Sequence, residues 1–267
     1  TYAGNDLITG DNGNNYIDAG SGDDKIAPGL GKDTINGGLG SDQVDYSKLN
    51  QAVEITAAAT DELGFSSFTA KLKGQNEKNF KSELRNIEKF IGYGNSFINL
   101  VNASRPLEKN QAHYAIESYY SSRVGSGGTI KGSKFDDVLE LDFGDKMNSS
   151  INDILKNKTP ASLSGGSGFN ILRLINLQKL DKQGRTFKLD KQAKSITMQE
   201  GGKTTTLANF SNIQEFQTSK GTTIDQVTGI ITFTNEPSNT ISSAKATSSQ
   251  DALPDSLMTT NIFSSNE

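Results

Sequence analysis

An aliphatic, β-branched residue recurs at every ninth position along the first 45 residues, and mostly glycine and polar residues fill the positions between. These apolar residues are Ile8, Ile17, Ile26, Ile35 and Val44. Each predicts a short strand with one side chain pointing inward. One turn plus one strand reverses the chain, so two nonapeptides complete a coil of 18 residues. The pattern therefore predicts a parallel solenoid whose aliphatic side chains line two small facing sheets.

The same period defines the turns. Its five copies are Thr1–Thr9, Gly10–Asp18, Ala19–Ala27, Pro28–Asn36 and Gly37–Asp45. Position four is always glycine, which permits the positive φ of a tight turn: Gly4, Gly13, Gly22, Gly31 and Gly40. Position six is Asp6, Asn15, Asp24, Asp33 and Asp42. With an 18-residue coil, Asp6, Asp24 and Asp42 stack along one edge of the solenoid, and Asn15 and Asp33 stack along the other.

Such a thin solenoid is not expected to be stable by itself. Each buried aliphatic side chain contributes about 2 kcal/mol at best, whereas ordering each residue costs roughly 1–2 kcal/mol. The stacked carboxylates add repulsion. A hard divalent cation between successive turns solves both problems, and Ca²⁺ accepts about six to eight oxygens from carboxylates and carbonyls, the ligands that these turns offer. The candidate metal-binding residues are those at positions four and six, together with Asp11.

Residues 1–45 resemble the calcium-binding nonapeptide repeats (GGxGxDxUx) of the RTX proteins, the secreted "repeats in toxin" family. The resemblance implies a calcium β-roll with Ca²⁺ as cofactor. It also implies a secreted protein, extracellular or on the cell surface, that is exported by a type I secretion transporter. A glycine- and aspartate-rich loop without metal is the alternative for one turn, but five turns in register favour the roll. Because Asn15 replaces the aspartate, we expect weaker calcium sites on its edge.

Echoes of the period return after Asp45 at Ile91–Asn99, Gly132–Glu140 and Gly165–Arg173. Each keeps the inward aliphatic residue and loses part of the ligand chemistry. They resemble the irregular coils that follow the repeats in many secreted RTX proteins, with Asp136 and Asp137 as their one candidate ligand pair. We therefore expect an all-β chain, with a parallel β-roll over 1–45 and an irregular β-solenoid or β-sandwich domain over 46–234.

Local patterns predict the elements of this second domain. Predicted strands are Ala52–Ala57, Ser66–Leu72, Lys203–Leu207 and Ile230–Thr234, and a hairpin is predicted from Thr186–Leu189 and Ser195–Met198. Apolar residues at helical spacing in Asn79–Ile91 allow a short amphipathic helix, and Ser149–Lys156 allows another.

Composition changes again over 235–267, which is rich in Ser, Thr, Asn and Ala. Composition alone predicts a flexible tail. The RTX resemblance implies a second interpretation, an uncleaved C-terminal signal that a type I secretion transporter reads. The chain starts within the repeat array and has no visible signal peptide, so we expect it to be a fragment that lacks upstream repeats and the effector part.

Charge is unevenly distributed. The net charge is −4, yet residues 1–45 carry eight Asp against Lys25 and Lys32, a net −6 that leaves +2 for the remainder. The acidity therefore lies where a cation is expected. Cysteine is absent, which fits export directly from the cytosol. No stretch approaches the roughly 18 apolar residues of a membrane span.

The chain lacks recognisable catalytic motifs. It has one histidine, His113, and neither an HExxH motif nor a cysteine, so we expect no enzymatic activity. His113, Tyr114 and the pair Tyr119–Tyr120 are a candidate sugar-stacking patch. A basic run over 71–89 is interrupted by acidic residues, which favours a solvated face over nucleic-acid binding.

These features predict a module for calcium-dependent folding and type I secretion at the C-terminus of an extracellular RTX protein. The alternative is a module of an RTX adhesin, surface-layer protein or exoenzyme that binds a cell-surface polysaccharide. A third option is a fragment of an enzyme whose catalytic part lies upstream.

Overall fold

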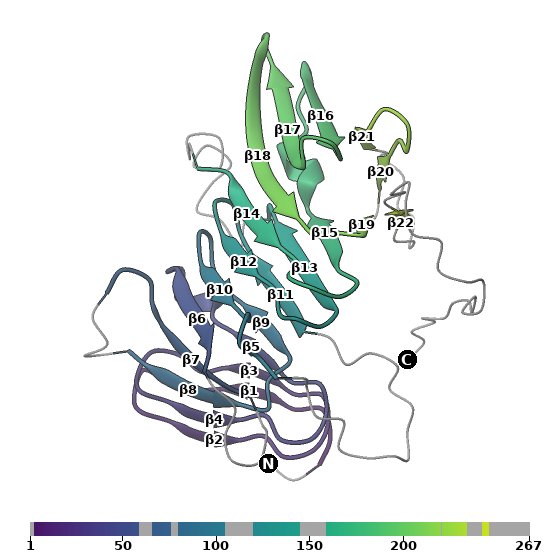
Figure 1. The fold of residues 1–267 in the computed structure, drawn as a ribbon. Helices are drawn as coiled ribbons and strands as arrows, with labels where there is room; N and C mark the ends of the chain where they lie inside the picture. The colour runs from purple at the N-terminus through teal and green to yellow at the C-terminus, as the bar shows by residue number, and fades with distance from the viewer. Residues whose placement is uncertain are drawn as a thin grey trace, which may run out of the picture.

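The computed structural model describes residues 3–58, 66–75, 80–104, 120–144, 159–219, 221–233 and 242–245. Two long β-sheets run through these residues, and the chain passes repeatedly from one to the other (Figure 1). One has nine strands and the other thirteen, and we call them the nine-stranded and the thirteen-stranded sheet. The all-β fold class, with a parallel roll at its start, is confirmed.

The N-terminal roll has the predicted register. Its strands are β1 Leu7–Thr9, β2 Tyr16–Asp18, β3 Lys25–Ala27, β4 Thr34–Asn36 and β5 Gln43–Asp45. β1, β3 and β5 pair in parallel in the nine-stranded sheet, where Ile26 lies opposite both Ile8 and Val44. β2 and β4 pair in parallel in the thirteen-stranded sheet, with Ile17 opposite Ile35. The 18-residue coil and its two facing rows of aliphatic side chains are therefore as predicted.

Both sheets continue past residue 45 without a break. The nine-stranded sheet is extended by β9 Lys89–Ile91, β11 Tyr120–Val124, β13 Asp137–Asp142, β15 Ile171–Ile175 and β19 Glu215–Thr218. The thirteen-stranded sheet is extended by β10 Phe97–Asn99, β12 Thr129–Lys131 and β14 Ala161–Ser164. Each echo of the nonapeptide contributes one of these strands, namely β10, β13 and β15. Of the two expected architectures, these strands form the irregular solenoid.

Two antiparallel meanders widen the thirteen-stranded sheet. The first comprises β6 Val53–Ala57, β7 Ser67–Leu72 and β8 Ser82–Arg85, and places β8 beside β4 and β6 beside β10. The second comprises β16 Arg185–Asp190, β17 Ser195–Glu200 and β18 Lys203–Ser211, with β18 beside β14. β20 Thr222–Ile224 and β21 Ile230–Phe233 pair at its outer edge. The strands and the hairpin predicted in these segments are confirmed.

The helix expected over 79–91 is wrong, because the described part of this stretch, 80–91, contains β8 and β9. Leu84 is buried while the residues on either side of it are exposed, which is the alternation of a strand. Asn86, with a φ of 51°, turns the chain between the two strands. The parallel partner β4 supplies hydrogen bonds that outweigh a weak helical spacing. The other expected helix, 149–156, lies outside the described residues. The described helices are the short 3₁₀ turns η1 Ser47–Leu49 and η2 Leu177–Leu180.

Aromatic residues thicken the core next to the first meander. Phe68 on β7 packs against Phe90 on β9 and Tyr120 on β11, with ring centroids 4.6 and 5.8 Å apart. All three side chains are buried, and the Tyr120 hydroxyl donates to the carbonyl oxygen of Ser104 at 2.8 Å. Tyr120 therefore does not belong to a surface patch for sugar stacking. The other members proposed for that patch, 113–114 and 119, lie outside the described residues.

One further strand, β22 Ser242–Lys245, pairs antiparallel with β19 at the edge of the nine-stranded sheet. It falls within the segment for which composition predicts a flexible tail, so these four residues differ from that expectation. The rest of 234–267 lies outside the described residues. The domain boundaries at 45 and 234 stay predictions.

Candidate metal centre

The turns of the roll bring successive coils into close contact. Gly4, Gly22, Gly31 and Gly40 have φ values between 121° and 128°. A Cβ atom on Gly40 would also overlap the carbonyl oxygen of Gly22, so both the backbone conformation and the close approach require glycine there. Gly13 lacks the positive φ of the other four position-four glycines.

The position-six side chains form a column of hydrogen bonds along the edge of the nine-stranded sheet. The Asp6 N–H donates to Asp24 Oδ1 at 2.7 Å, and the Asp24 N–H donates to Asp42 Oδ1 at 2.9 Å. The column does not end with the repeats, because the Asp42 N–H donates to Glu88 Oε2 at 2.8 Å. We call Asp6, Asp24, Asp42 and Glu88 the acidic column. The sequence predicted its first three members and missed the fourth.

Two buried oxygens in the acidic column have no protein partner. Asp24 and Asp42 are 1% and 0% exposed, and the Oδ2 atom of each lacks a hydrogen bond. Absence of a side chain at Gly37 leaves room for the Asp42 carboxylate, since a Cβ there would lie 2.5 Å from Oδ2. A buried carboxylate oxygen without a donor is costly. A cation that prefers carboxylate and carbonyl oxygens would satisfy both atoms, so this column fits Ca²⁺.

The electrostatics of the column also favour a cation. Burial is the main cause that raises the pKa of Asp42 to about 6, and the nearby charges of Asp24 and Asp23 add to it. Burial likewise raises the pKa of Glu88 to about 7, with a further contribution from Asp42. Both carboxyl groups therefore resist ionisation in the fold. A divalent cation would reverse this by stabilising the charged forms.

The opposite edge of the roll is organised differently. The Asn15 N–H donates to Asp33 Oδ1 at 2.9 Å and the Ser82 hydroxyl donates to Oδ2 at 3.1 Å, so both oxygens of Asp33 have donors. Burial raises the pKa of Asp33. The exposed Asp11 carboxylate accepts the Gly13 N–H at 2.7 Å and the Asn15 side-chain amide at 2.9 Å. These two hydrogen bonds, first that from Asn15, lower the pKa of Asp11. The two edges are therefore unequal in hydrogen bonding, while the ligand role of each residue stays a prediction.

Position five carries a second set of hydrogen bonds that the sequence analysis missed. Asn5 Oδ1 accepts the Asp23 N–H at 2.8 Å, and Asp23 Oδ1 accepts the Ser41 N–H at 2.9 Å. Asn14 Oδ1 accepts the Lys32 N–H at 2.9 Å on the other edge. The available signal was the Asn or Asp at position five in each of the first three repeats.

The later echoes keep this hydrogen bonding but not the unpartnered oxygens. The Asp137 N–H donates to Asn170 Oδ1 at 3.0 Å, and Asp136 Oδ1 accepts the Phe169 N–H at 2.8 Å. The Asp137 carboxylate itself accepts the N–H and hydroxyl of Ser133. Burial raises its pKa to about 7. Protein donors therefore take the place that a cation would take in the roll.

Among the described residues, no three His, Asp or Glu side chains gather into one compact metal cluster. The carboxylates instead follow one another at one per coil, so each ion would draw its ligands from adjacent coils and their turn carbonyls. A cation held in this way connects strands that are distant in sequence.

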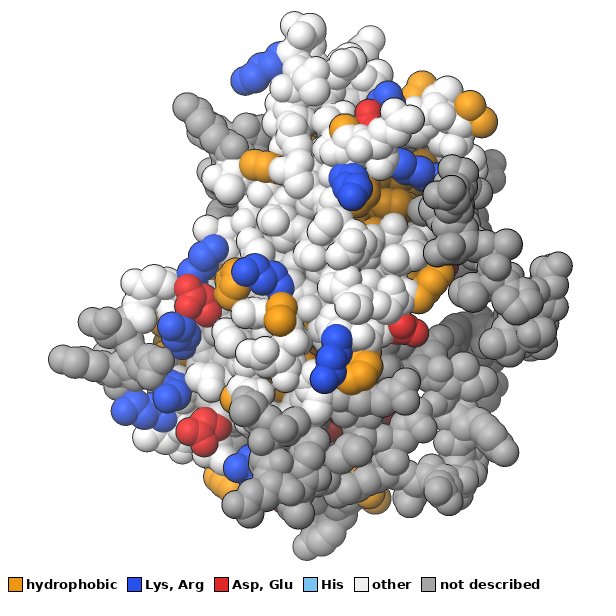
Figure 2. All heavy atoms as spheres, viewed as in Figure 1, with side chains coloured by type: hydrophobic (Ala, Val, Ile, Leu, Met, Phe, Trp, Pro, Cys, Tyr) orange, Lys and Arg blue, Asp and Glu red, His pale blue; other side chains and the backbone are white. Residues whose placement is uncertain are grey.

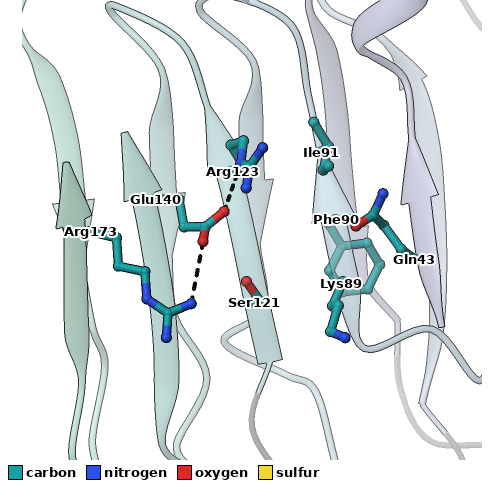
Figure 3. Close-up of a pocket in the computed structure, with 8 residues that line it drawn as sticks. All are labelled: Gln43, Lys89, Phe90, Ile91, Ser121, Arg123, Glu140 and Arg173. Atoms are coloured by element: carbon teal, nitrogen blue, oxygen red, sulfur yellow. Dashed lines mark hydrogen bonds and ion pairs between the residues drawn. The ribbon is translucent and has the colours of Figure 1, made fainter. Parts of the chain in front are cut away.

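A polar groove of about 200 Å³ lies on the nine-stranded sheet, between the roll and the later coils. Glu140 Oε2 accepts Arg123 Nε at 2.6 Å, and its Oε1 lies 3.4 Å from Arg173 Nη1. Figure 3 shows the Glu140 carboxylate between the two guanidinium groups, with Lys89 and Gln43 on the strands across the groove. The groove therefore contains two arginines that pair with one carboxylate, and Lys89 lies on a strand across from them.

Elsewhere the basic residues are dispersed. Figure 2 shows Lys and Arg side chains in small separate groups on one face of the molecule. In the basic run, Lys71 Nζ lies 3.2 Å from Glu54 Oε2 on the neighbouring strand. This pairing fits the solvated face that the sequence predicts for that run.

The fold and the acidic column together define a parallel β-roll with carboxylates stacked along one edge. Residues 1–26 and 29–44 match the family model of the RTX calcium-binding nonapeptide repeat, in four copies. The N-terminal segment is an RTX repeat array, and such repeats bind Ca²⁺. The match covers the repeat array alone, so it assigns calcium binding to this segment and not to the rest of the chain. No curated protein matches it. No helix in the described ranges is long and apolar enough to cross a membrane.

Proposed function

We propose that this chain is a calcium-driven folding and secretion module of an extracellular RTX protein, without enzymatic activity of its own. The observation that carries the proposal is the pair of buried, unpartnered oxygens on Asp24 and Asp42. Burial of these two oxygens makes folding of the roll energetically costly without a cation and favourable with one. The module therefore responds to the difference between low calcium in the cytosol and high calcium outside.

Mutual repulsion in the acidic column destabilises the roll when calcium is scarce. Carboxylates on adjacent strands lie roughly 4.8 Å apart, and at an effective dielectric constant near 20 each pair of charges repels by about 3 kcal/mol. Ca²⁺ that binds only the folded roll adds its binding free energy to folding, about 2.7 kcal/mol per site at 100 times the dissociation constant. Folding outside the cell would then oppose return through the transporter.

Order in the roll is transmitted to the rest of the solenoid by strand pairing. β9 pairs in parallel with β5, and β8 pairs in parallel with β4. Both sheets of the later coils therefore start on strands of the roll. In a solenoid each coil is stabilised mainly by its neighbours, so a folded roll is a template for the coils that follow.

The export role is tested by deletion in a host that carries a matching type I transporter. Removal of 235–267 is expected to abolish secretion, and removal of 1–45 is expected to leave the chain exported but degraded or poorly folded outside. Secretion that persists without 235–267 would leave that segment without an export role. Secretion that stops only without 1–45 would place the export role in the roll.

A second candidate function is binding of an anionic polysaccharide in the polar groove. The observation that favours it is that Lys89, Arg123 and Arg173 line the groove, where Glu140 pairs with the two arginines. A uronate polymer is the probe, compared with a neutral polymer of similar length. Lys89→Gln should weaken retention of the uronate polymer at least about tenfold, and Lys131→Gln, on an exposed position of β12 in the other sheet, should not. Equal retention of both polymers would exclude this function.

A further inference from the structure

Glu88 occupies position six of the coil that follows the roll. β9 pairs in parallel with β5, with Lys89 opposite Gln43, which sets Glu88 beside Asp42. Its Oε2 accepts the Asp42 N–H at 2.8 Å, as the Oδ1 atoms of Asp24 and Asp42 accept the position-six N–H of the coil before them. Glu88 is 46 residues from Asp42 instead of 18, because the first meander lies between them. The nonapeptide pattern therefore does not predict its position.

The chain contains a second copy of the same connection, in which a glutamine stands in the place of Glu88. This copy shows whether the hydrogen bond to the preceding coil needs a charged acceptor. The chain reads NIEKF over 86–90 and NIQEF over 212–216, each between the last strand of a meander and the nine-stranded sheet. The asparagines that begin them, Asn86 and Asn212, have φ values of 51° and 54°. Gln214 stands where Glu88 stands, and its Oε1 accepts the Asn170 N–H at 2.8 Å. An amide therefore suffices for the hydrogen bond.

Glu88 and Gln214 differ in the position-six residue that each contacts, which is Asp42 for Glu88 and Asn170 for Gln214. The Asn170 side-chain amide donates to the carbonyl oxygens of Ser167 and Asn212, both at 3.0 Å. Asp42, which is 0% exposed, keeps its Oδ2 without a partner. A negative charge thus stands only next to the residue that still needs a cation, and an uncharged side chain stands next to the residue whose polar atoms are satisfied.

We propose that Glu88 is a calcium ligand, and that the last calcium site of the acidic column lies between Asp42 and Glu88. The inference rests on the proposed calcium role of the roll. Adjacent strands are about 4.8 Å apart, which is close to twice the calcium–oxygen distance of about 2.3–2.6 Å. One ion can therefore contact carboxylates of adjacent coils. Asp42 comes from the repeat array and Glu88 from the solenoid.

Calcium at this site would tie the two parts of the chain together. Glu88 precedes Phe90 by two residues, and the buried Phe90 ring packs 4.6 Å from that of Phe68 on the first meander. An ion between Asp42 and Glu88 holds β9 against β5. Calcium-induced order therefore passes from the roll into the aromatic part of the core and the coils stacked on it.

The test is calorimetric titration of the full chain with CaCl₂. Glu88→Gln keeps the hydrogen-bond acceptor, as Gln214 does, and removes the charge. Glu83→Gln on β8 is the matched control, because Glu83 is exposed and outside the column. Asp24→Asn tests whether the repeat array itself binds calcium. Melting temperatures in calcium and in chelator, followed by circular dichroism, provide a second measurement.

We expect Glu88→Gln to lose one calcium ion or to bind it at least about tenfold more weakly, without a lower melting temperature in chelator. Glu83→Gln should match the wild type. Wild-type calcium binding by Glu88→Gln, together with weakened binding by Asp24→Asn, would overturn the ligand role of Glu88 but leave the calcium function of the roll intact. Unchanged binding by both would overturn the calcium function of the roll. If Glu88→Gln does not fold, Glu88→Asp decides, because its carboxylate is one methylene shorter: weakened calcium binding supports the ligand role, and wild-type calcium binding contradicts it.

Discussion

Asp24→Asn should have opposite effects on stability with and without calcium. Asp24 lies between Asp6 and Asp42 in the acidic column, and its Oδ1 accepts the Asp6 N–H, a bond that an amide oxygen can keep. Its Oδ2 is buried without a partner. Substitution by asparagine removes the charge at nearly constant volume. The variant therefore tests the charge separately from packing.

The magnitude follows from the spacing of the column. In chelator, loss of the Asp24 charge removes repulsion with two neighbours, each pair about 3 kcal/mol at an effective dielectric constant near 20. Partial protonation, which the raised pKa of Asp42 indicates, reduces this gain. We expect a net stabilisation of about 1–3 kcal/mol. With saturating calcium, two adjacent sites each lose a charged ligand, and a tenfold loss of affinity at each corresponds to about 2.8 kcal/mol of destabilisation.

Circular dichroism melts of wild type and Asp24→Asn, in chelator and in millimolar calcium, measure both effects. The melting temperature of the variant should be the higher one in chelator and the lower one in calcium. A shift in the same direction under both conditions would identify Asp24 as an ordinary structural residue. That result would refute the cation-based account of the column.

Three further outcomes are expected. Gly40→Ala should destabilise the calcium-loaded roll by at least about 1–3 kcal/mol, measured by denaturant unfolding, because its φ is 128° and a Cβ would overlap the Gly22 carbonyl; a neutral effect would contradict the close stacking of turns. Asn15→Asp should raise calcium affinity on the weaker edge, measured calorimetrically, and an unchanged affinity would remove Asn15 from the candidate ligands. Asp137→Asn should flatten the pH dependence of stability. Burial raises the folded-state pKa of Asp137 from 3.8 to about 7, so its favourable contribution is complete below about pH 4 and is lost as the pH rises to 7, at most about 4 kcal/mol. Parallel stability curves for Asp137→Asn and wild type would contradict this.

The structure of the repeat array was predictable because one short period determines its strands, its turns and the direction of its side chains. Position eight points inward, position four turns the chain, and position six returns every 18 residues on the same edge. These relations need only the handedness and pleat of a strand. The fold of the roll and three members of the acidic column, Asp6, Asp24 and Asp42, follow from that period.

Glu88 could not be found in the same way. Its place beside Asp42 depends on the first meander, which inserts β6 and β7 and lengthens the coil from 18 to 46 residues. The spacing of apolar residues over 79–91 also resembles that of a helix, although the partner strand β4 determines its structure. Pairing between strands that are distant in sequence is the information that a local pattern lacks.

Hydrogen exchange followed by mass spectrometry measures the central claim most directly, because it reports on residues 3–45 separately from the rest of the chain. The amides of this segment should be protected in millimolar Ca²⁺ and exchange rapidly in chelator. Mg²⁺ at the same concentration should not protect them, because it requires a stricter octahedral geometry and releases its water reluctantly. Equal protection in calcium, magnesium and chelator would contradict a roll that calcium folds.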